Sequence, residues 1–380
     1  MKDRRMTPSA TAAAHARAAP SPLPGQVVLV LQGGGALGAY QIGVFEALHG
    51  AGIEPDWVIG TSIGAINAAL IAGNSPENRL ERLEEFWRHV QSPRSIAGPF
   101  DWLGMGNLVA NMTTVMRGIP AFFEPNLPSL RGVRASVGIE QAAYYSTAPL
   151  RETLSGLVDL ERLNDGPMRL TVGAVNAASG AMRYFDSRKE RLRIDHVMAS
   201  GALPPAFPAV RIDGQAYWDG GIYSNTPIEA VLDDMPRRDS LIFAVNVWHQ
   251  AGPEPDSIWE VMARHKDIQF ASRADSHILR QKQLHRLRHV IRELSQELPA
   301  GKRSEAHCKE LAAWGCSTTM HVAHLVAPRL DDEDSTKDID FSPAGVRARR
   351  EAGFADTLRM IERAPWTAAT DPIEGVIEHR

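Results

Sequence analysis

Short apolar runs alternate with helical segments along the first seventy residues of the chain. Residues 26–32 (QVVLVLQ) are almost continuously apolar, as in a strand that is buried on both faces of a parallel sheet. A helical pattern follows at about 39–50 and ends at a glycine. A second apolar strand at 55–60 then leads into a helix that reaches about residue 72. This β-α-β-α order predicts an α/β fold with a mainly parallel central sheet that is covered by helices.

Strand-like and helical segments continue through the rest of the chain in a less regular order. Strand-like runs predict strands at 170–176, 182–185, 210–218, 241–247 and 321–326, and periodic patterns predict helices at about 76–92, 256–298 and 343–363. Residues 97–135 form an apolar stretch that glycine and proline interrupt. Such a stretch is either part of the core or a mobile lid, and its glycines and prolines favour a lid.

The composition limits what the chain can do. With 380 residues, 44% of them hydrophobic, the chain is long enough for a large core. A net charge of -4 argues against nucleic acid as a partner, because a basic surface is needed to bind it. We expect a disordered N-terminal arm at 1–25, the main α/β domain at 26–250, and a mostly helical C-terminal extension with one strand at 251–380.

No segment of the sequence is suited to cross a membrane. Residues 1–25 contain no apolar run of the length of a secretory signal, and no segment reaches 18 consecutive apolar residues. The two cysteines, Cys308 and Cys316, are too few for a disulfide framework, and the nearby histidines do not complete a known zinc spacing. We therefore expect a cytoplasmic protein without a metal site, whose contact with a bilayer is at most peripheral. The sequence does not predict the oligomeric state.

The most informative segment joins the second strand to its helix. There Ser62 lies between Gly60 and Gly64 in the pattern Gly-x-Ser-x-Gly. Glycines two positions before and after a serine remove the Cβ atoms that would clash in a sharp strand-to-helix turn. The serine then takes a strained conformation at the tip of the turn, at the positive end of a helix. This layout indicates a nucleophile elbow, although the pattern by itself also occurs in ordinary Gly-Ser turns.

A glycine-rich loop follows the first strand at residues 33–38 and has the pattern Gly-x-Gly-x-x-Gly. One interpretation is a dinucleotide-binding loop, which needs an acidic residue at the end of the second strand to bind the ribose. Asp56 has roughly the right separation but lies at the start of that strand, whose end is taken by the serine turn. The other interpretation is a row of unobstructed backbone N–H groups that stabilise an oxyanion. The adjacent serine turn favours this second interpretation.

A serine nucleophile needs a base, because a free hydroxyl is unreactive at neutral pH. None of the 13 histidines lies in a convincing turn at the end of a strand. Asp219 is the alternative, because it ends a strand within Tyr217-Trp218-Asp219-Gly-Gly and precedes a helix start. Partial burial beside the two aromatic residues would raise its proton affinity and make it a base. By itself, an Asp-Gly-Gly sequence is most often a simple turn.

Together, the glycine loop, the serine turn and the Asp-Gly-Gly turn resemble the three motifs of the patatin-like phospholipases. Residues 197–207 (VMASGALPPAF) and 225–227 also look like family segments, and the resemblance covers about residues 26–247. It implies a three-layer α/β/α fold and a serine esterase that cleaves acyl esters of lipids. Ser62 would be the nucleophile and Asp219 its base, in a dyad without histidine, metal or organic cofactor.

The resemblance also assigns roles to the glycines. It implies an oxyanion hole built from the backbone N–H groups of Gly33, Gly34 and Gly35, helped by that of Ile63. The other motif glycines are Gly38, Gly60, Gly64, Gly220 and Gly221.

Leu37 departs from the family pattern, since relatives often have arginine or lysine at this position. A cation there could assist the oxyanion or bind a lipid phosphate, so leucine leaves open whether phospholipids or neutral esters are the substrate. Two other functions remain as alternatives. The chain could be a catalytically silent lipid-binding protein with the same fold, or a nucleotide-binding protein, which the missing ribose acid disfavours.

The predicted helix at 256–298 is rich in basic residues. They are Arg264, Lys266, Arg273, Arg280, Lys282, Arg286, Arg288 and Arg292. A basic amphipathic helix can lie on an anionic membrane surface, although a solvated helix face is the more common outcome. The expected partners are therefore a lipid acyl ester as substrate and, if this helix binds lipid, a membrane surface.

Overall fold

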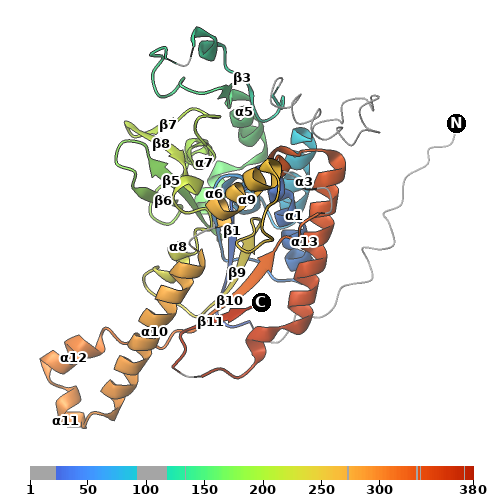
Figure 1. Cartoon of the computed structure of the whole chain (residues 1–380). Coiled ribbons are helices and arrows are strands. Elements are labelled where there is room, and N and C mark those ends of the chain that lie inside the picture. Colours follow the sequence, from blue (N-terminus) through green and yellow to red (C-terminus); the bar gives the residue numbers. More distant parts are fainter. Residues whose placement is uncertain are drawn as a thin grey trace.

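The computed structural model describes residues 23–91, 118–132, 134–271, 274–330, 333, 335–371 and 373–380. Most of the predicted N-terminal arm, most of the predicted lid and Arg273 lie outside the described residues. Figure 1 shows a central sheet with helices on both faces and a helical arm that extends away from the sheet. None of the helices in the described part of the chain is long and apolar enough to cross a membrane.

A nine-stranded sheet forms the centre of the described structure, with the order β11-β10-β9-β1-β2-β5-β8-β7 and with β6 also paired to β5. Its strands are β1 (Gln26–Leu31), β2 (Trp57–Gly60), β5 (Arg169–Asn176), β6 (Met182–Asp186), β7 (Val210–Ile212), β8 (Gln215–Asp219), β9 (Ser240–Asn246), β10 (Met320–Val326) and β11 (Val376–His379). The pairs from β11 to β5 are parallel, and β6, β7 and β8 pair in antiparallel fashion. The prediction of a mainly parallel central sheet is confirmed.

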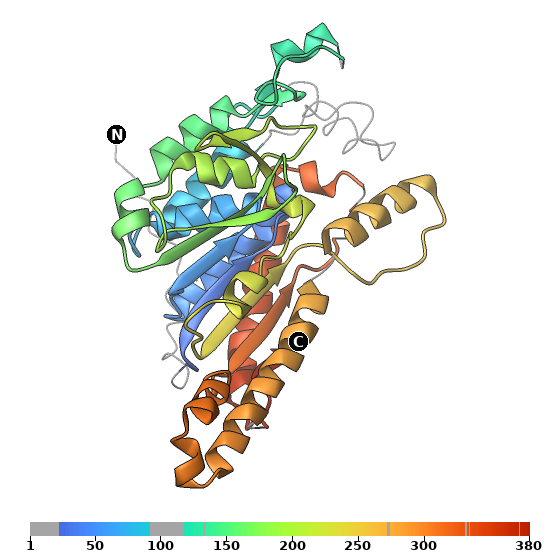
Figure 2. The same ribbon diagram turned by 90° about the vertical axis from the view of Figure 1, so that its left-hand side faces the viewer.

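Helices cover both faces of this sheet (Figure 2). They are α1 (Ala39–Gly50), α2 (Ile63–Ala72), α3 (Arg79–Val90), α5 (Ala148–Leu157), α6 (Leu160–Asp165), α7 (Ile194–Ser200), α8 (Glu229–Leu232), α9 (Ile258–Ala271), α10 (Ala274–Glu297), α11 (Ala300–Arg303), α12 (Ala306–Ala312) and α13 (Pro343–Arg363). A small hairpin of β3 (Glu124–Pro125) and β4 (Tyr145–Ser146) lies apart from the sheet. The three-layer α/β/α arrangement agrees with the fold that the resemblance implies.

The central strand β1 explains the layering. Successive side chains of a strand point to opposite faces of a sheet. Val27, Leu29 and Leu31 accordingly belong to the core formed with α1, α2, α3 and α13, and Val28 and Val30 belong to the core formed with α8 and α10. A strand that is buried on both faces must be apolar throughout, which is why the sequence pattern identifies it.

The C-terminal region is an integral part of this sheet. β10 and β11 extend it beyond β9, and α13 packs on α1 so closely that a Cβ atom at Gly43 would overlap the Arg350 carbonyl. The expectation of one strand after residue 250 is therefore wrong, because β11 is a second one. Its four residues, VIEH, are too short and too mixed in polarity to show a strand pattern. The division of the chain at residue 250 stays a prediction.

Two other predicted elements are divided in the structure. The predicted strand at 210–218 is a hairpin of β7 and β8, which turns at Asp213 and Gly214, both with positive φ angles. The predicted helix at 256–298 consists of α9 and α10. The periodic pattern indicates helix correctly in the second case, but it does not show where one helix ends and the next begins.

Candidate active site

Ser62 lies in the sharp turn between β2 and α2, and its backbone has φ 56° and ψ -126°. A residue other than glycine is rarely found at such a positive φ angle, because its Cβ atom strains the backbone. Strained residues of this kind cluster at functional sites. The flanking glycines make the turn possible, because a Cβ atom at Gly60 would overlap the Gly64 carbonyl and one at Gly64 would overlap the Leu31 carbonyl. The geometry is that of a nucleophile elbow.

Ser200 holds the turn from the opposite side. The Ser62 N–H donates to the backbone oxygen of Ser200 at 3.1 Å and to its Oγ at 3.1 Å. The Ser200 hydroxyl in turn donates to the carbonyl of Gly173 in β5 at 2.6 Å and is completely buried. The strained conformation is thus fixed by hydrogen bonds from two other elements of the fold. The sequence analysis includes Ser200 in a family segment but does not identify this role.

Asp219 ends β8 and faces Ser62. Because β8 runs against β5, its end reaches back to the residues beside the serine turn, where Ala174 is its partner in the sheet. The Asp219 side chain is only 2% exposed and accepts a hydrogen bond from the Gly221 N–H at 2.7 Å. Burial raises the pKa of this carboxyl to about 7, while hydrogen bonds from the Gly221 amide and from the Ser62 hydroxyl act to lower it.

The glycine loop places three backbone donors beside Ser62. The N–H groups of Gly34, Gly35 and Ile63 have no hydrogen-bond partner among the described residues. Gly35 has a φ of +55°, which favours glycine, and Ile63 is the first residue of α2, where helix N–H groups are unsatisfied. These groups are suited to bind an oxyanion.

The expectation that the Gly33 N–H group helps to form the oxyanion hole is wrong. Its N–H donates to the backbone oxygen of Asn225 at 3.1 Å and is therefore not available to a substrate. Its carbonyl accepts hydrogen bonds from Asn225 Nδ2 at 3.0 Å and from Trp248 Nε1 at 2.8 Å. Gly33 anchors the loop, and a Cβ atom at this position would come 2.9 Å from the Cβ of Ser62.

Gln32 completes the anchor of the loop. Its side-chain oxygen accepts hydrogen bonds from the N–H groups of Val247 (2.6 Å) and Trp248 (3.0 Å), and its nitrogen donates to Thr226 Oγ1 at 2.7 Å. Gln32 is completely buried. A polar residue at the end of an apolar strand is the signal that could have identified it, because such a group must find hydrogen-bond partners when it is buried.

A cavity of 210 Å³ opens onto Ser62 and Asp219. Its apolar lining consists of Ile63, Ile66, Phe122, Phe123, Tyr145, Leu203, Ala206, Phe207, Trp248, Phe270, Ile339 and Phe341. No histidine, lysine or arginine is among the described residues that line it. Phe122 and Phe123 belong to the described end of the predicted lid and their rings pack against that of Phe207, so this end of the segment is a wall of the cavity.

The C-terminal region supplies a second wall of the same cavity. Phe270 comes from α9, and Ile339 and Phe341 come from the segment that precedes α13. The backbone carbonyl of Phe270 also accepts a hydrogen bond from Asn225 Nδ2 at 3.0 Å. The carbonyl of Asp338 approaches Gly35 so closely that a Cβ atom there would overlap it. The sequence analysis does not connect this region with the site, because these contacts join segments that are far apart in the chain.

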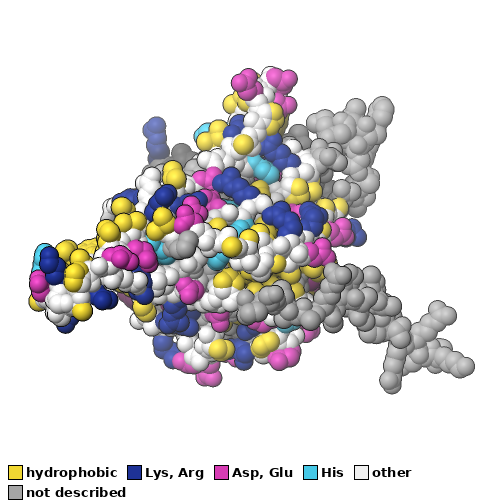
Figure 3. Space-filling view, turned by 90° about the horizontal axis from the view of Figure 1, so that it is seen from below, with side chains coloured by type: hydrophobic (Ala, Val, Ile, Leu, Met, Phe, Trp, Pro, Cys, Tyr) yellow, Lys and Arg dark blue, Asp and Glu magenta, His cyan; other side chains and the backbone are white. Residues whose placement is uncertain are grey.

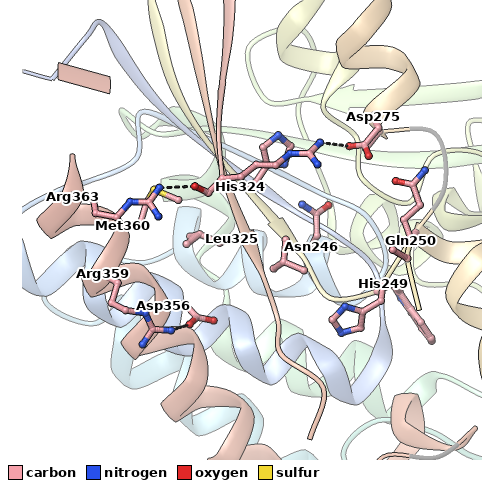
Figure 4. Close-up of a pocket in the computed structure, with 16 residues that line it drawn as sticks. Asn246, His249, Gln250, Asp275, His324, Leu325, Asp356, Arg359, Met360 and Arg363 are labelled. Atoms are coloured by element: carbon pink, nitrogen blue, oxygen red, sulfur yellow. Dashed lines mark hydrogen bonds and ion pairs between the residues drawn. The ribbon is translucent and has the colours of Figure 1, made fainter. Parts of the chain in front are cut away.

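A larger cavity of 590 Å³ lies near the ends of β9 and β10 and shares Trp248 with the cavity at Ser62. Its charged side chains largely pair with one another, as Arg359 does with Asp356 and Arg380 with Asp275 (Figure 4). No serine, threonine, cysteine or lysine is among the described residues that line it. It therefore offers no hydroxyl, thiol or lysine amine as a nucleophile among its described lining residues.

The structure gives no support to the dinucleotide interpretation. Asp56 accepts a hydrogen bond from the N–H of Val27 at 2.8 Å. Val27 lies near the start of β1, whereas the glycine loop follows the end of that strand. Asp56, the acidic residue considered for ribose binding, therefore lies at the opposite end of the strands from the glycine loop.

Comparison with known proteins agrees with this geometry. A family model described as "Patatin-like phospholipase" matches residues 29–232, more than half of the chain, and one described as "Patatin phospholipase" matches residues 268–373. The chain is 26% identical over 238 residues to a "cGAMP-activated phospholipase" of Pseudomonas aeruginosa (strain BWHPSA011 / Pa011), a match that covers 58% of this chain and 61% of that protein.

Other matches are more limited in extent. The chain is 44% identical over 73 residues to the human "Patatin-like phospholipase domain-containing protein 6", which covers 19% of this chain and 5% of that protein. It spans less than two thirds of the length of these relatives. Among solved structures, VipD of Legionella pneumophila is matched with 16% identity and a TM-score of 0.38, over 90% of this chain and 67% of that one. With the first family model covering more than half of its length, the chain belongs to the patatin-like phospholipase family.

Proposed function

We propose that the protein is a serine hydrolase that cleaves acyl esters of lipids with Ser62 as nucleophile and Asp219 as base. One observation carries this proposal, namely a strained, hydrogen-bonded Ser62 that faces a buried carboxyl inside an apolar cavity. Burial gives the carboxyl the proton affinity of a general base near neutral pH. Membership of the family and the named phospholipases among its relatives support the same activity.

The reaction follows from these positions in two steps. Asp219 takes the proton of the Ser62 hydroxyl while Oγ attacks the ester carbonyl, and the resulting oxyanion is stabilised by the N–H groups of Gly34, Gly35 and Ile63. The alcohol leaves with the proton from Asp219, and an acyl-serine remains. Asp219 then activates a water molecule, which releases the fatty acid and restores the serine. No histidine is required, and none lines the described part of the cavity.

The lining of the cavity indicates which part of the lipid it takes. Its walls are aromatic and aliphatic, and no cationic side chain is among its described lining residues. Leu37, at the position where relatives carry a cation, is buried with an exposed fraction of 3%. The cavity therefore suits an acyl chain, and it offers no ion pair to a phosphate group beside the reacting carbonyl. We propose that acyl-chain binding, more than the head group, selects the substrate.

Labelling with a fluorophosphonate probe tests the proposed function directly. The probe phosphonylates an activated serine, so we expect one label per chain, located on Ser62 by peptide mass spectrometry. Ser62→Ala should not be labelled, and Ser155→Ala, which changes an exposed serine of α5, should be labelled like the wild type. A protein that is folded but not labelled would instead be the catalytically silent lipid-binding protein that the sequence leaves open.

The pH dependence of hydrolysis should report the buried carboxyl. Because Asp219 acts as base only when it is ionised, and because burial raises its pKa to about 7, kcat/KM should rise with pH and level off above about 7. A carboxylate with an ordinary pKa would give this rise near pH 4. Initial rates on a soluble p-nitrophenyl ester between pH 5 and pH 9 measure the profile. A flat profile over this range would contradict the assignment.

Contact with a lipid surface is a separate proposal and rests on α10. Arg280, Arg286 and Arg292 are each exposed on this helix, whereas Lys282 pairs with Glu378 at 3.6 Å. Arg288 is partly buried beside His285. Figure 3 shows basic and hydrophobic side chains together on the projecting arm. Among the described basic residues of α10, the three exposed arginines are therefore the ones available to anionic head groups.

We expect the exposed arginines of α10 to bind the protein to anionic liposomes. Each should contribute up to about 1 kcal/mol near the surface, and salt should weaken the effect. Replacing Arg280, Arg286 and Arg292 with glutamine should reduce cosedimentation and leave hydrolysis of a soluble ester unchanged. A matched control replaces three other exposed arginines, Arg191, Arg193 and Arg211. If the wild type does not cosediment with these liposomes even at low ionic strength, α10 is only a solvated helix.

A further inference from the structure

Two histidines and a cysteine meet where the helical arm α10–α12 joins the sheet, away from the Ser62 cavity. His285 and His289 are one turn apart on α10 and so lie on the same face of that helix. Cys316 follows α12 in the segment that leads into β10. One nitrogen of each histidine and the Sγ of Cys316 all lie within 4.8 Å of one another. The sequence analysis places Cys316 near other histidines and does not foresee this grouping.

His285 is buried without satisfactory hydrogen bonds. Its side chain is completely inaccessible, and neither ring nitrogen has a hydrogen-bond partner of good geometry among the described residues. A weak hydrogen bond with the backbone of Leu232 is the polar contact that the ring makes. A buried polar group of this kind normally has a partner, and one without a partner in the protein suggests that a ligand takes the place.

The two imidazole rings point to a space that a glycine keeps open. A Cβ atom at Gly375 would lie 3.1 Å from Nδ1 of His285 and 2.9 Å from Nε2 of His289. Any larger residue would therefore fill the space between the two nitrogens. His289 Nε2 is also 3.0 Å from the backbone oxygen of Thr318, and this hydrogen bond must give way when Nε2 binds an ion.

The segment that carries Cys316 is fixed in position on α10. The Cys316 N–H donates to the carbonyl of Arg288 at 3.2 Å, and the thiol lies 2.8 Å from the hydroxyl of Thr318. The sulfur is therefore brought to the two histidines by backbone contacts and not by a chance side-chain rotamer. A ligand set that is held before binding requires little ordering when an ion arrives.

The ligand atoms of the group favour one class of ion. The guanidinium groups of Arg288 and Arg237 lie near His285. Asp233 is the acidic group that faces Arg288. No carboxylate is among the three side chains, and proteins hold Mg²⁺ and Ca²⁺ through carboxylates and carbonyl oxygens. Imidazole and thiolate ligands instead select softer ions.

We propose that His285, His289 and Cys316 bind one Zn²⁺ ion, which fastens the arm to the sheet. Two imidazole nitrogens and a thiolate are ligands that zinc takes, and its usual four-coordinate geometry leaves one position for water or for the Thr318 carbonyl. The thiol of Cys316 loses its proton to solvent when the ion binds. The ion stabilises the packing of α10 on the segment before β10 and takes no part in ester hydrolysis.

Titration of the chelator-treated, reduced full-length chain with Co²⁺ and then Zn²⁺ tests the proposal. Tetrahedral Co²⁺ with a thiolate ligand gives visible bands and a near-ultraviolet sulfur-to-cobalt band. We expect both at one equivalent of Co²⁺, their loss on addition of Zn²⁺, and one zinc per chain by elemental analysis. Zinc should also raise the melting temperature of the protein, because an ion that binds only the folded state stabilises it.

Single substitutions identify the ligands. Cys316→Ser should abolish the sulfur-to-cobalt band and lower zinc content at least tenfold, and His289→Gln should lower zinc content similarly. Cys308→Ser and His277→Asn, which change the other cysteine and another histidine of α10, should behave like the wild type. Circular dichroism without metal checks that each variant folds. If His289→Gln does not fold, the more conservative Cys316→Ser alone tests the proposed ligand set. A wild type without the band, or a Cys316→Ser variant that keeps it, would overturn the proposal.

Discussion

Ser62→Ala should lower ester hydrolysis by at least about a thousand-fold, because it removes the atom that forms the acyl intermediate. The substitution keeps the Cβ atom in its strained turn and leaves the hydrogen bonds from the Ser62 N–H to Ser200 in place. We therefore expect a folded protein whose melting temperature is close to that of the wild type. Turnover of p-nitrophenyl acyl esters and thermal melting, measured on the same preparation, check both parts.

Ser155→Ala is the matched control for this experiment, since it removes a hydroxyl from the exposed face of α5. It should retain wild-type turnover. Near-normal hydrolysis by Ser62→Ala would refute the nucleophile assignment. A large loss of turnover together with a large fall in melting temperature would indicate a role for the hydroxyl in folding.

Asp219→Asn should lower kcat by about a hundred-fold or more, because an amide cannot take the serine proton. The same substitution should stabilise the protein. The shift of the carboxyl pKa from 3.8 to about 7 corresponds to about 4 kcal/mol against the buried charge. With a raised folded-state pKa, this penalty is absent below about pH 4, grows as pH rises toward 7 and is complete above it. An amide carries no charge, so Asp219→Asn lacks this penalty at every pH.

Denaturant unfolding at pH 8 and at pH 5 measures this effect. The variant should exceed the wild type in free energy of unfolding at pH 8, and the difference should shrink at pH 5. Asp165→Asn, which changes an exposed aspartate, should affect neither activity nor stability. His249→Asn alters a histidine beside Trp248 and should cost far less activity than Asp219→Asn. If His249→Asn folds and loses as much activity as Asp219→Asn, the histidine would have to be added to the proposed catalytic residues.

A local motif can be identified from sequence when the physical constraint behind it is also local. The turn at Ser62 requires glycines two positions away on either side, because their Cβ atoms would strike the backbone of the turn and of β1. The apolar pattern of β1 and the helical pattern of α1 and α13 reflect burial along a single element. The order of these elements predicts the parallel sheet and, with Asp219, the residues of the site.

Tertiary structure alone decided how the pieces of the site are held and closed. The N–H of Gly33 is occupied by Asn225, 192 residues further along the chain, and no local pattern can show that. Phe270 and Phe341 reach the cavity from the C-terminal region, which the sequence does not connect with the site. The grouping of His285 with Cys316 likewise depends on how α10 packs on the segment before β10.

The strand limits show the same division. β11 is a short strand of mixed polarity, and it joins the sheet because β10 offers its free edge. The hairpin of β7 and β8 is predicted as one strand, although its Asp213-Gly214 turn, with positive φ angles, is a local signal that the sequence contains. The sequence by itself determined that Ser62 lies in a turn between two glycines, that Asp219 ends a strand, and in what order the main elements follow, because these depend on neighbours along the chain. The free donors, the cavity walls and the sheet edges follow from contacts between distant segments, and only the folded structure specifies them.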